Sequence, residues 1–194
     1  MGTRDVILDA AATVMAERGL ANVTTRQIAQ AAGFTEAALY KHFSNKADLL
    51  VAVMRERSPG FTPLAQALNA RAGTGTVADN LAGVARAAIA LYSKGFPMFA
   101  SMFADPATLA VHKEELLHQG TGPHKANEAV AAYLRAEQKL GRLRPEADVT
   151  AAAGLLLGAC FQYAFLGHMS PPAERDDDAA AASFVRALLQ SLAS

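Results

Sequence analysis

Apolar side chains recur every three or four residues along most of the chain, which is the spacing of one face of an α-helix. Thr3 precedes the first such segment and can cap it, and Gly19 follows it, where a helix commonly ends. No segment shows a sustained alternation of apolar and polar β-branched residues, as a strand would. The pattern therefore predicts an all-α protein. The apolar stripe of the first helix consists of Val6, Ile7, Ala10, Ala11, Val14 and Met15.

Glycine and proline divide the rest of the pattern. A helix begins at Ser44 or Asn45, faces inward with Leu49, Leu50, Val53 and Met54, and stops at Ser58-Pro59-Gly60. This break predicts two domains, residues 1–56 and residues 57–194. The glycine-rich runs at 73–76 and 120–123 lack the strand and lysine of a phosphate-binding loop, so they are connectors. Further helices are expected at 61–72, 77–93, 97–119 with a kink at Asp105-Pro106, 123–140, 148–168 and 176–192.

The segment from Thr24 to Lys46 predicts two short helices joined by a three-residue turn. Thr24 caps the first helix, and Gln27 at its third position reaches back to the cap. Gly33 supplies the left-handed residue that the turn needs, and Thr35 caps the second helix. Phe34 is expected to fill the core beneath the turn. The other inward positions are Ile28, Ala29, Ala32, Leu39 and Phe43. Such a pair of helices is a DNA-reading element.

The run G-F-T-E-A-A-L-Y-K-H-F-S-N-K, from Gly33 to Lys46, resembles the signature of the TetR family of bacterial transcriptional repressors. T-R-Q-I-A, from Thr25 to Ala29, resembles the preceding helix of that family. Phe34 departs from the usual valine, and Ala37 stands where glycine or proline is frequent. The resemblance implies an N-terminal three-helix helix-turn-helix domain, followed by a larger helical domain that binds a ligand and dimerises.

The resemblance also implies which residues contact DNA. The second helix of the pair is expected to enter the major groove, where each base pair presents its own donors and acceptors. The matching positions for base edges are Arg26, Glu36, Ala37, Ala38 and Lys41. Thr25, Tyr40, His42 and Lys46 match phosphate-contacting positions, and Thr35 joins the DNA-binding set. Tyr40 and His42 can instead stabilise the helix end, and Lys46 can be merely solvated.

The charge balance bears on a nucleic-acid partner. Eighteen Lys and Arg residues cancel eighteen Asp and Glu residues, and residues 1–57 carry only +1. A small net charge predicts few phosphate contacts per subunit, and hence a dependence on dimerisation for affinity. The same neutrality keeps open an alternative, a helical interaction module that has lost operator binding.

One cysteine excludes an intramolecular disulfide framework and fits a reducing interior. The N-terminus has no secretory or acylation pattern, so a cytoplasmic protein without a membrane partner is expected. Residues 149–173 contain no charged residue and are long enough to span a bilayer, but are only weakly apolar. A buried or interfacial helix explains this segment better.

The last two helices are expected to form a homodimer interface. In proteins of the resembled family, two such helices from each subunit pair in a four-helix bundle. The positions that this implies are Leu156, Cys160, Tyr163, Phe184, Val185, Leu188, Leu189 and Leu192. An entirely intramolecular core has the same periodicity, so the two interpretations stay open.

The regulatory domain is expected to bind a small apolar or amphipathic effector that releases the DNA, because a deformable Met and Phe face follows residue 97. The effector itself is not specified, and no cofactor is expected. The candidate pocket residues are Phe61, Leu64, Leu68, Tyr92, Met98, Phe99, Met102, Phe103, His112, Tyr133, Phe161 and Gln162. Each of these can equally be plain core.

Neither catalysis nor a metal site is expected. His112, His118 and His124 are six residues apart, which rotates each away from the previous one on a helix. Cys160 lies among apolar residues, where a thiol is inert, and no Ser, His and Asp arrangement emerges. The sequence therefore favours a DNA-binding regulator over an enzyme.

Overall fold

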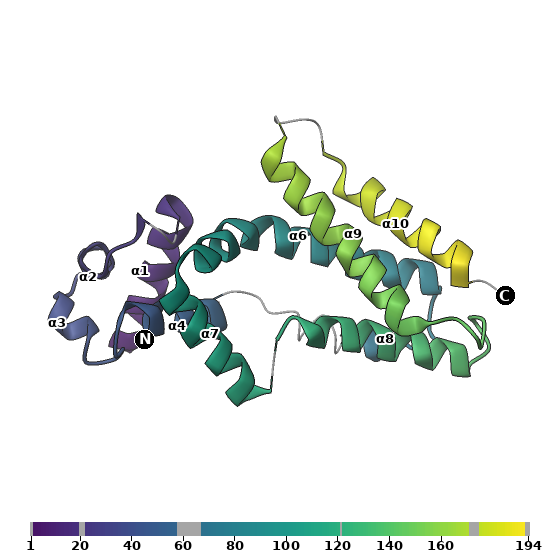
Figure 1. Cartoon of the computed structure of the whole chain (residues 1–194), viewed down its shortest axis with the longest axis horizontal. Helices are drawn as coiled ribbons and strands as arrows, with labels where there is room; N and C mark the ends of the chain where they lie inside the picture. The colour runs from purple at the N-terminus through teal and green to yellow at the C-terminus, as the bar shows by residue number, and fades with distance from the viewer. Residues whose placement is uncertain (1, 20–21, 58–66, 121, 171–174, 193–194) are drawn as a thin grey trace. The chain divides into compact units, whose positions relative to one another are not determined.

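The computed structural model describes residues 2–19, 22–57, 67–120, 122–170 and 175–192, and all regular elements in these ranges are helices (Figure 1). The all-α prediction is confirmed. The helices are α1 (Thr3–Arg18), α2 (Thr25–Ala32), α3 (Glu36–Leu39), α4 (Lys46–Arg57), α6 (Val77–Ala104), α7 (Pro106–Gln119), α8 (His124–Lys139), α9 (Val149–Met169) and α10 (Asp177–Leu192).

The chain forms two compact units. The first comprises residues 1–60 and 95–120, and the second comprises residues 61–94 and 121–194. Helix α6 contributes residues to both. The contacts therefore group residues 95–120 with the N-terminal helices. The predicted functional domains, 1–56 and 57–194, instead have a single boundary along the chain.

Two details of the first unit differ from the sequence prediction. Thr3 does not cap α1 but is its first helical residue, because the extended residue before the helix is Gly2 (φ −76°, ψ 158°). Phe34 does not fill the core but is 36% exposed. Its amide donates to the Ala29 carbonyl (2.9 Å) in the turn that ends α2. The core beneath closes without the ring, since Ile28 and Leu39 are both 0% exposed.

The caps of the two reading helices form as predicted. The Thr24 hydroxyl accepts the Gln27 amide (3.2 Å), and the Gln27 side-chain oxygen accepts the Thr24 amide (3.0 Å). Gly33 is left-handed (φ 76°) and ends α2. The Thr35 hydroxyl accepts the Ala38 amide (3.2 Å) and so starts α3. These local hydrogen bonds define both ends of α2 and the start of α3.

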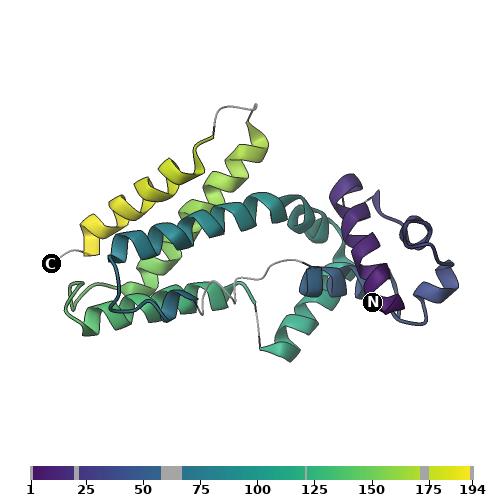
Figure 2. The same ribbon diagram turned by 180° about the vertical axis from the view of Figure 1, so that it is seen from behind.

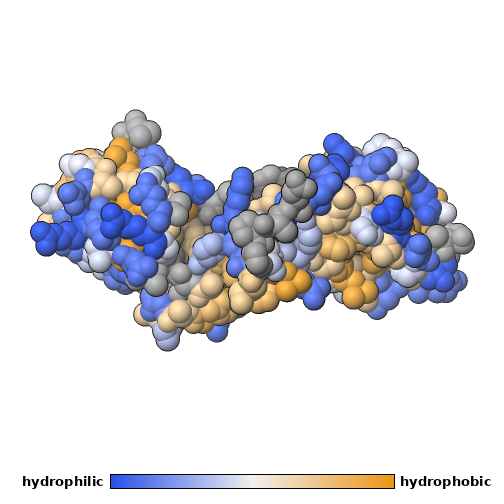
Figure 3. Space-filling model, turned by 90° about the horizontal axis from the view of Figure 1, so that it is seen from above, coloured by the Kyte–Doolittle hydropathy of each residue, from blue (hydrophilic) through white to orange (hydrophobic). Residues whose placement is uncertain are grey.

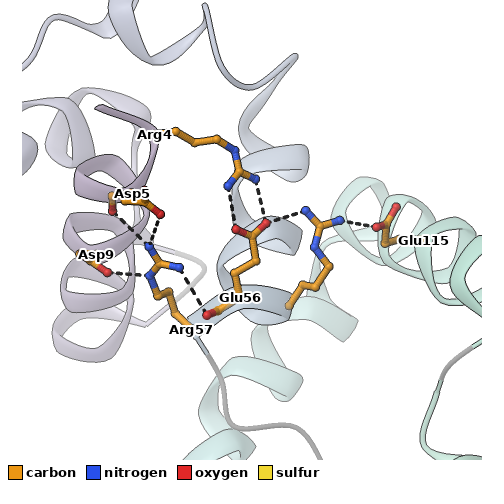
Figure 4. A network of polar contacts seen from close by, with 7 residues as sticks. Arg4, Asp5, Asp9, Glu56, Arg57 and Glu115 are labelled. Carbon is orange, nitrogen blue, oxygen red and sulfur yellow. Dashed lines mark hydrogen bonds and ion pairs between the residues drawn. The ribbon is translucent and has the colours of Figure 1, made fainter. Parts of the chain in front are cut away.

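A network of ion pairs joins α1, α4 and α7 in the first unit (Figure 4). Glu56 lies at its centre. Arg4 donates to both oxygens of Glu56 (2.7 and 2.8 Å), and Arg55 donates to one of them (2.6 Å) and to Glu115. The hydrogen bonds from Arg4 and then Arg55 lower the pKa of Glu56 to about 2, against the effect of partial burial. Beside it, Arg57 contacts Asp5 (3.0 Å) and Asp9 (2.6 Å).

Helix α6 runs through the predicted break before Pro97, and the predicted kink at Asp105-Pro106 is a complete break between α6 and α7. Pro97 has no N–H to donate to the carbonyl of Ser93, four residues earlier. His168 of α9 compensates, since its Nε2 lies 2.9 Å from that carbonyl oxygen and donates to it. At the break, Asp105 caps α7 by accepting the Ala107 amide (3.3 Å), with Pro106 as the first helical residue.

In the second unit, α8 packs against α9 and α9 against α10, as both views of the ribbon show (Figures 1 and 2). The first half of the predicted 61–72 helix lies outside the described residues; in the second half, residues 67–69 are helical and residues 70–72 form a turn. The apolar core includes Leu81 and Ile89 of α6, Leu134 of α8 and Leu156 of α9, all no more than 1% exposed. This packing supplies most of the stability of the unit, at about 2 kcal/mol per buried aliphatic side chain.

The second unit also buries a polar group. Glu137 of α8 is 0% exposed; it accepts the Gly73 amide (3.1 Å) and lies 3.0 Å from the Arg142 guanidinium. Asn80 donates to the Tyr133 hydroxyl (3.0 Å) beside it. Burial raises the pKa of Tyr133 to about 12. These contacts tie the 73–76 connector to α8.

Candidate nucleic-acid interface

Most of the predicted DNA-contacting side chains lie at the surface of α2, α3 and the turn after α3. The exposed ones are Arg26, Thr35, Glu36, Ala37, Tyr40, Lys41 and His42; Ala38 and Lys46 are partly buried, and Thr25 is buried. The element therefore presents its cationic side chains outward while Leu39 and Phe43 anchor it to the core, as predicted.

Thr25, Glu36 and Tyr40 contact one another instead of pointing separately into solvent. The Thr25 hydroxyl donates to the Glu36 carboxylate, and the Tyr40 hydroxyl donates to the Thr25 oxygen at 3.4 Å. Thr25 is only 8% exposed. The three side chains thus fasten the start of α2 to α3, and they hold Arg26 and Lys41 on a fixed backbone.

Lys46, at the start of α4, has an anionic neighbour within its own unit. Asp105 is hydrogen-bonded by the Thr108 hydroxyl (2.6 Å), and this bond and the charge of Lys46 both lower the pKa of Asp105. The ammonium of Lys46 is therefore placed near the carboxylate of Asp105. An incoming phosphate would have to compete with this carboxylate for the ammonium.

The predicted effector residues are divided between the two units. Met98, Phe99, Met102, Phe103 and His112 belong to the first, and Leu68, Tyr92, Tyr133, Phe161 and Gln162 belong to the second; Phe61 and Leu64 lie outside the described residues. In the first unit Met102 is buried, whereas Phe103 is 68% exposed. Burial lowers the pKa of His112.

In the second unit, Tyr92 of α6 and Phe161 of α9 meet edge to face, with ring centroids 5.4 Å apart. Tyr133 is not part of this pair. It bonds to Asn80, which lies 12 residues before Tyr92 on the same helix, or about 18 Å along its axis. The ring contact therefore brings Tyr92 and Phe161 together, away from Tyr133.

Five of the eight residues predicted at the dimer interface already lie in the core of their own unit. These are Leu156, Cys160, Val185, Leu188 and Leu192, each no more than 8% exposed, whereas Tyr163, Phe184 and Leu189 are partly buried. The Tyr163 and Phe184 rings pack edge to face at 5.9 Å, which joins α9 to α10.

The exposed apolar face of α9 consists of other residues. Leu155 is 68% exposed, Leu166 is 49% exposed and Met169 is 69% exposed. Apolar residues gather at the surface of this part of the chain, next to hydrophilic ones (Figure 3). A Cβ added to Gly154 or Gly158 would meet nothing within 4 Å. Periodicity alone could not identify this face, because α9 is apolar on nearly every side.

The described residues also bear on a metal site and on a membrane-spanning helix. No group of three or more His, Cys, Asp and Glu side chains gathers there as a metal would require. Helix α9 is long and apolar enough to cross a membrane by length and composition alone, with a mean hydropathy of 1.7 over a window that is 39% buried. One such helix is weak evidence, since core helices of soluble proteins pass the same test.

Two capped helices at a tight turn, with cationic side chains held outward on a fixed backbone, define a helix-turn-helix DNA-binding protein. The chain belongs to the TetR family of bacterial transcriptional regulators. Residues 7–53 match "Bacterial regulatory proteins, tetR family", and residues 79–191, more than half of the chain, match "AefR-like transcriptional repressor, C-terminal domain". The protein is therefore a DNA-binding regulator and not an enzyme.

Among curated relatives, the transcriptional repressor KstR2 of Rhodococcus jostii is 46% identical over 54 residues, which are 28% of this chain and 26% of KstR2. The chain thus matches about a quarter of the length of such relatives. A solved TetR-family structure from Mesorhizobium loti aligns over 99% of this chain and 97% of its own, with a TM-score of 0.78 and 17% identity.

A second solved structure is SmeT, the repressor of the Stenotrophomonas maltophilia multidrug efflux pump SmeDEF. It covers 100% of this chain and 92% of its own, with a TM-score of 0.71 and 24% identity. SmeT has also been solved in complex with triclosan. At these identities both structures establish the fold, which is the predicted helix-turn-helix domain followed by a helical domain.

Two exposed residues, Gln30 on α2 and Phe34 in the turn, lie outside the predicted DNA-binding set. Gln30 was not assigned a role, and Phe34 was assigned to the core. The apolar character of Phe34 favoured burial. The signal that could have corrected it was its place directly after Gly33, where a helix-ending turn directs the chain outward.

Proposed function

We propose that the protein is a ligand-released repressor that binds a palindromic operator as a homodimer in the cytoplasm. Residues 1–56 read the DNA, and residues 57–194 bind the effector and dimerise. The observation that carries this proposal is the exposed face of α2, α3 and the turn after α3. On this face Arg26 and Lys41 stand outward, and two side-chain caps fix the helix starts.

The chemistry of this face suits the major groove. The Arg26 guanidinium has the fork that matches O6 and N7 of guanine, and Ala37 can contact a thymine methyl. His42 and Lys46 offer donors to phosphates, which set the register without reading sequence. Because the whole chain is neutral, each subunit neutralises few phosphates, and a second subunit multiplies the affinity by linking two half-sites.

The α9 face supports the dimer. Leu155, Leu166 and Met169 leave an apolar surface that a second copy would cover, and Gly158 lets another helix approach closely. We expect Leu155→Glu to convert a dimer to a monomer in light scattering after size exclusion. Leu117→Glu is the matched control, because Leu117 is 82% exposed on α7. A wild-type monomer at all concentrations, or equal effects of both substitutions, would contradict this interface.

The DNA-binding test begins with selection of preferred sequences from fragmented genomic DNA. Arg26→Ala should cost about 1 to 3 kcal/mol and relax base choice at one position of each half-site. Lys46→Ala should weaken all sequences alike and reduce the salt slope by about 1. Arg135→Ala, at an exposed arginine of α8, is the control and should change neither. Binding to no sequence at low salt by a verified dimer would favour the interaction module instead.

Release by an effector is tested separately. We assign the effector to the partly exposed pair Tyr92 and Phe161, because two aromatic rings in contact suit an apolar or amphipathic molecule. Triclosan, bound by SmeT, is a reasonable first probe. A releasing ligand must bind the DNA-free state more tightly by the same factor by which it weakens DNA binding. Equal affinity with and without operator would exclude release by that compound, and Phe161→Ala should weaken binding of any compound that does release.

A further inference from the structure

A hollow on the first unit lies between the end of α2 and the start of α3. Its lining residues are Arg26, Ala29, Gln30, Phe34, Thr35 and Glu36. Four of these, Arg26, Gln30, Thr35 and Glu36, are exposed polar residues, and Phe34 adds an aromatic ring that is 36% exposed. The hollow therefore continues the DNA-reading face toward the turn, with two residues to which no role has been assigned.

The position of Phe34 is set by the backbone. Gly33 is left-handed and ends α2, and the Phe34 amide donates to Ala29 at 2.9 Å. The ring cannot move into the core, because Ile28 and Leu39 already close it at 0% exposure. An apolar ring held at the surface beside a DNA-reading helix would gain free energy if bound DNA covered it.

Gln30 supplies the complementary polar group. It lies one helical turn after Arg26, so both side chains leave the same face of α2. The carboxamide of glutamine can donate to N7 of adenine and accept from its N6 amino group. In the major groove, the thymine of that pair presents its methyl group next to these atoms. One A·T pair thus offers an amide partner and an apolar contact side by side.

We propose that Gln30 and Phe34 read one A·T base pair in each half-site, Gln30 at the adenine edge and Phe34 at the thymine methyl. This inference rests on the proposed operator binding and adds a position to it. It also gives the aromatic ring at position 34 a consequence, namely a larger apolar contact with the thymine methyl than a valine would make.

The test uses the operator obtained by selection, with single atoms removed at each position. Uracil in place of thymine removes the methyl, and 7-deazaadenine in place of adenine removes N7. At one position per half-site, the wild-type protein should lose affinity on both changes, by about 5- to 100-fold for the pair together. Phe34→Ala should be insensitive to uracil at that position, and Gln30→Ala should be insensitive to 7-deazaadenine there.

Three controls separate this result from general damage. Phe34→Leu keeps an apolar contact and should retain part of the methyl dependence, and thermal unfolding shows whether each variant folds. Leu117→Ala removes another exposed apolar side chain and should leave the pattern unchanged. If Gln30→Ala and Phe34→Ala keep the full wild-type sensitivity at every position, the inference is wrong. Absence of any sequence preference in the wild type would instead count against the proposed function.

Discussion

The buried carboxylate of Glu137 allows a quantitative prediction for the second unit. Glu137 is 0% exposed, and its Oε2 lies 3.0 Å from Arg142 but accepts no hydrogen bond among the described residues. The Arg142 guanidinium compensates the charge of this carboxylate, which also interacts with the Tyr133 side chain. Arg142→Met removes that cation and leaves the carboxylate buried.

The expected magnitude follows from burial. Removing one partner of a buried ion pair costs about 3 to 5 kcal/mol, because the remaining charge loses its compensation. Arg142 is 29% exposed, so water screens part of the pair, and we expect about 3 kcal/mol for Arg142→Met. Glu137→Gln keeps the acceptor for the Gly73 amide and frees Arg142 to turn toward solvent, so we expect about 1 kcal/mol.

The measurement is urea unfolding followed by far-ultraviolet circular dichroism. The double variant should be close to Glu137→Gln alone, because Arg142→Met costs little once the charge has gone. Arg135→Met, at an exposed arginine of α8, serves as the control for a lost surface cation. The reasoning fails if Arg142→Met costs no more than Arg135→Met, or if the two substitutions in the pair are simply additive.

Three further predictions concern other parts of the chain. Glu56 should stabilise the first unit fully above its ordinary pKa of 4.5, and the stabilisation should disappear as the pH falls from there to about 2; Glu56→Gln should flatten this acid limb of a stability profile. Pro97→Ala gives the carbonyl of Ser93 a donor within α6, so His168→Ala should cost less stability in that background than in the wild type; equal costs in a double-mutant cycle would argue against compensation. Burial raises the pKa of Cys160 to about 12, so iodoacetamide should label it at pH 8 only after unfolding, as mass spectrometry would show.

Features decided by neighbouring residues could be predicted from the sequence. The Thr24 capping box and the left-handed Gly33 depend on residues at most three or four positions away. The continuity of α6 through Pro97 could not be predicted in the same way. It depends on His168, which is 75 residues from the carbonyl that it satisfies.

The sequence also could not predict which residues of α9 are buried, because this helix is apolar on nearly every side. Leu155 and Leu156 are adjacent and identical in type, yet one is 68% exposed and the other 1% exposed. The difference comes from the position of α8 and α10 around α9, which periodicity does not encode. The prediction of an interface on α9 and α10 therefore stays a prediction, and the structure adds only which apolar residues of α9 are exposed.

Gly154 and Gly158 of α9 have open space beside them in the single chain. A substitution there can therefore stabilise the subunit and still weaken its pairing. An alanine at Gly154 or Gly158 meets no neighbour in a single chain and should strengthen the helix by roughly 1 kcal/mol. In the proposed homodimer, the added methyl groups would nevertheless hold a second α9 further away. Selection for a more heat-resistant subunit would thus accept substitutions that impair pairing, and only an assay of the paired protein would reveal the loss.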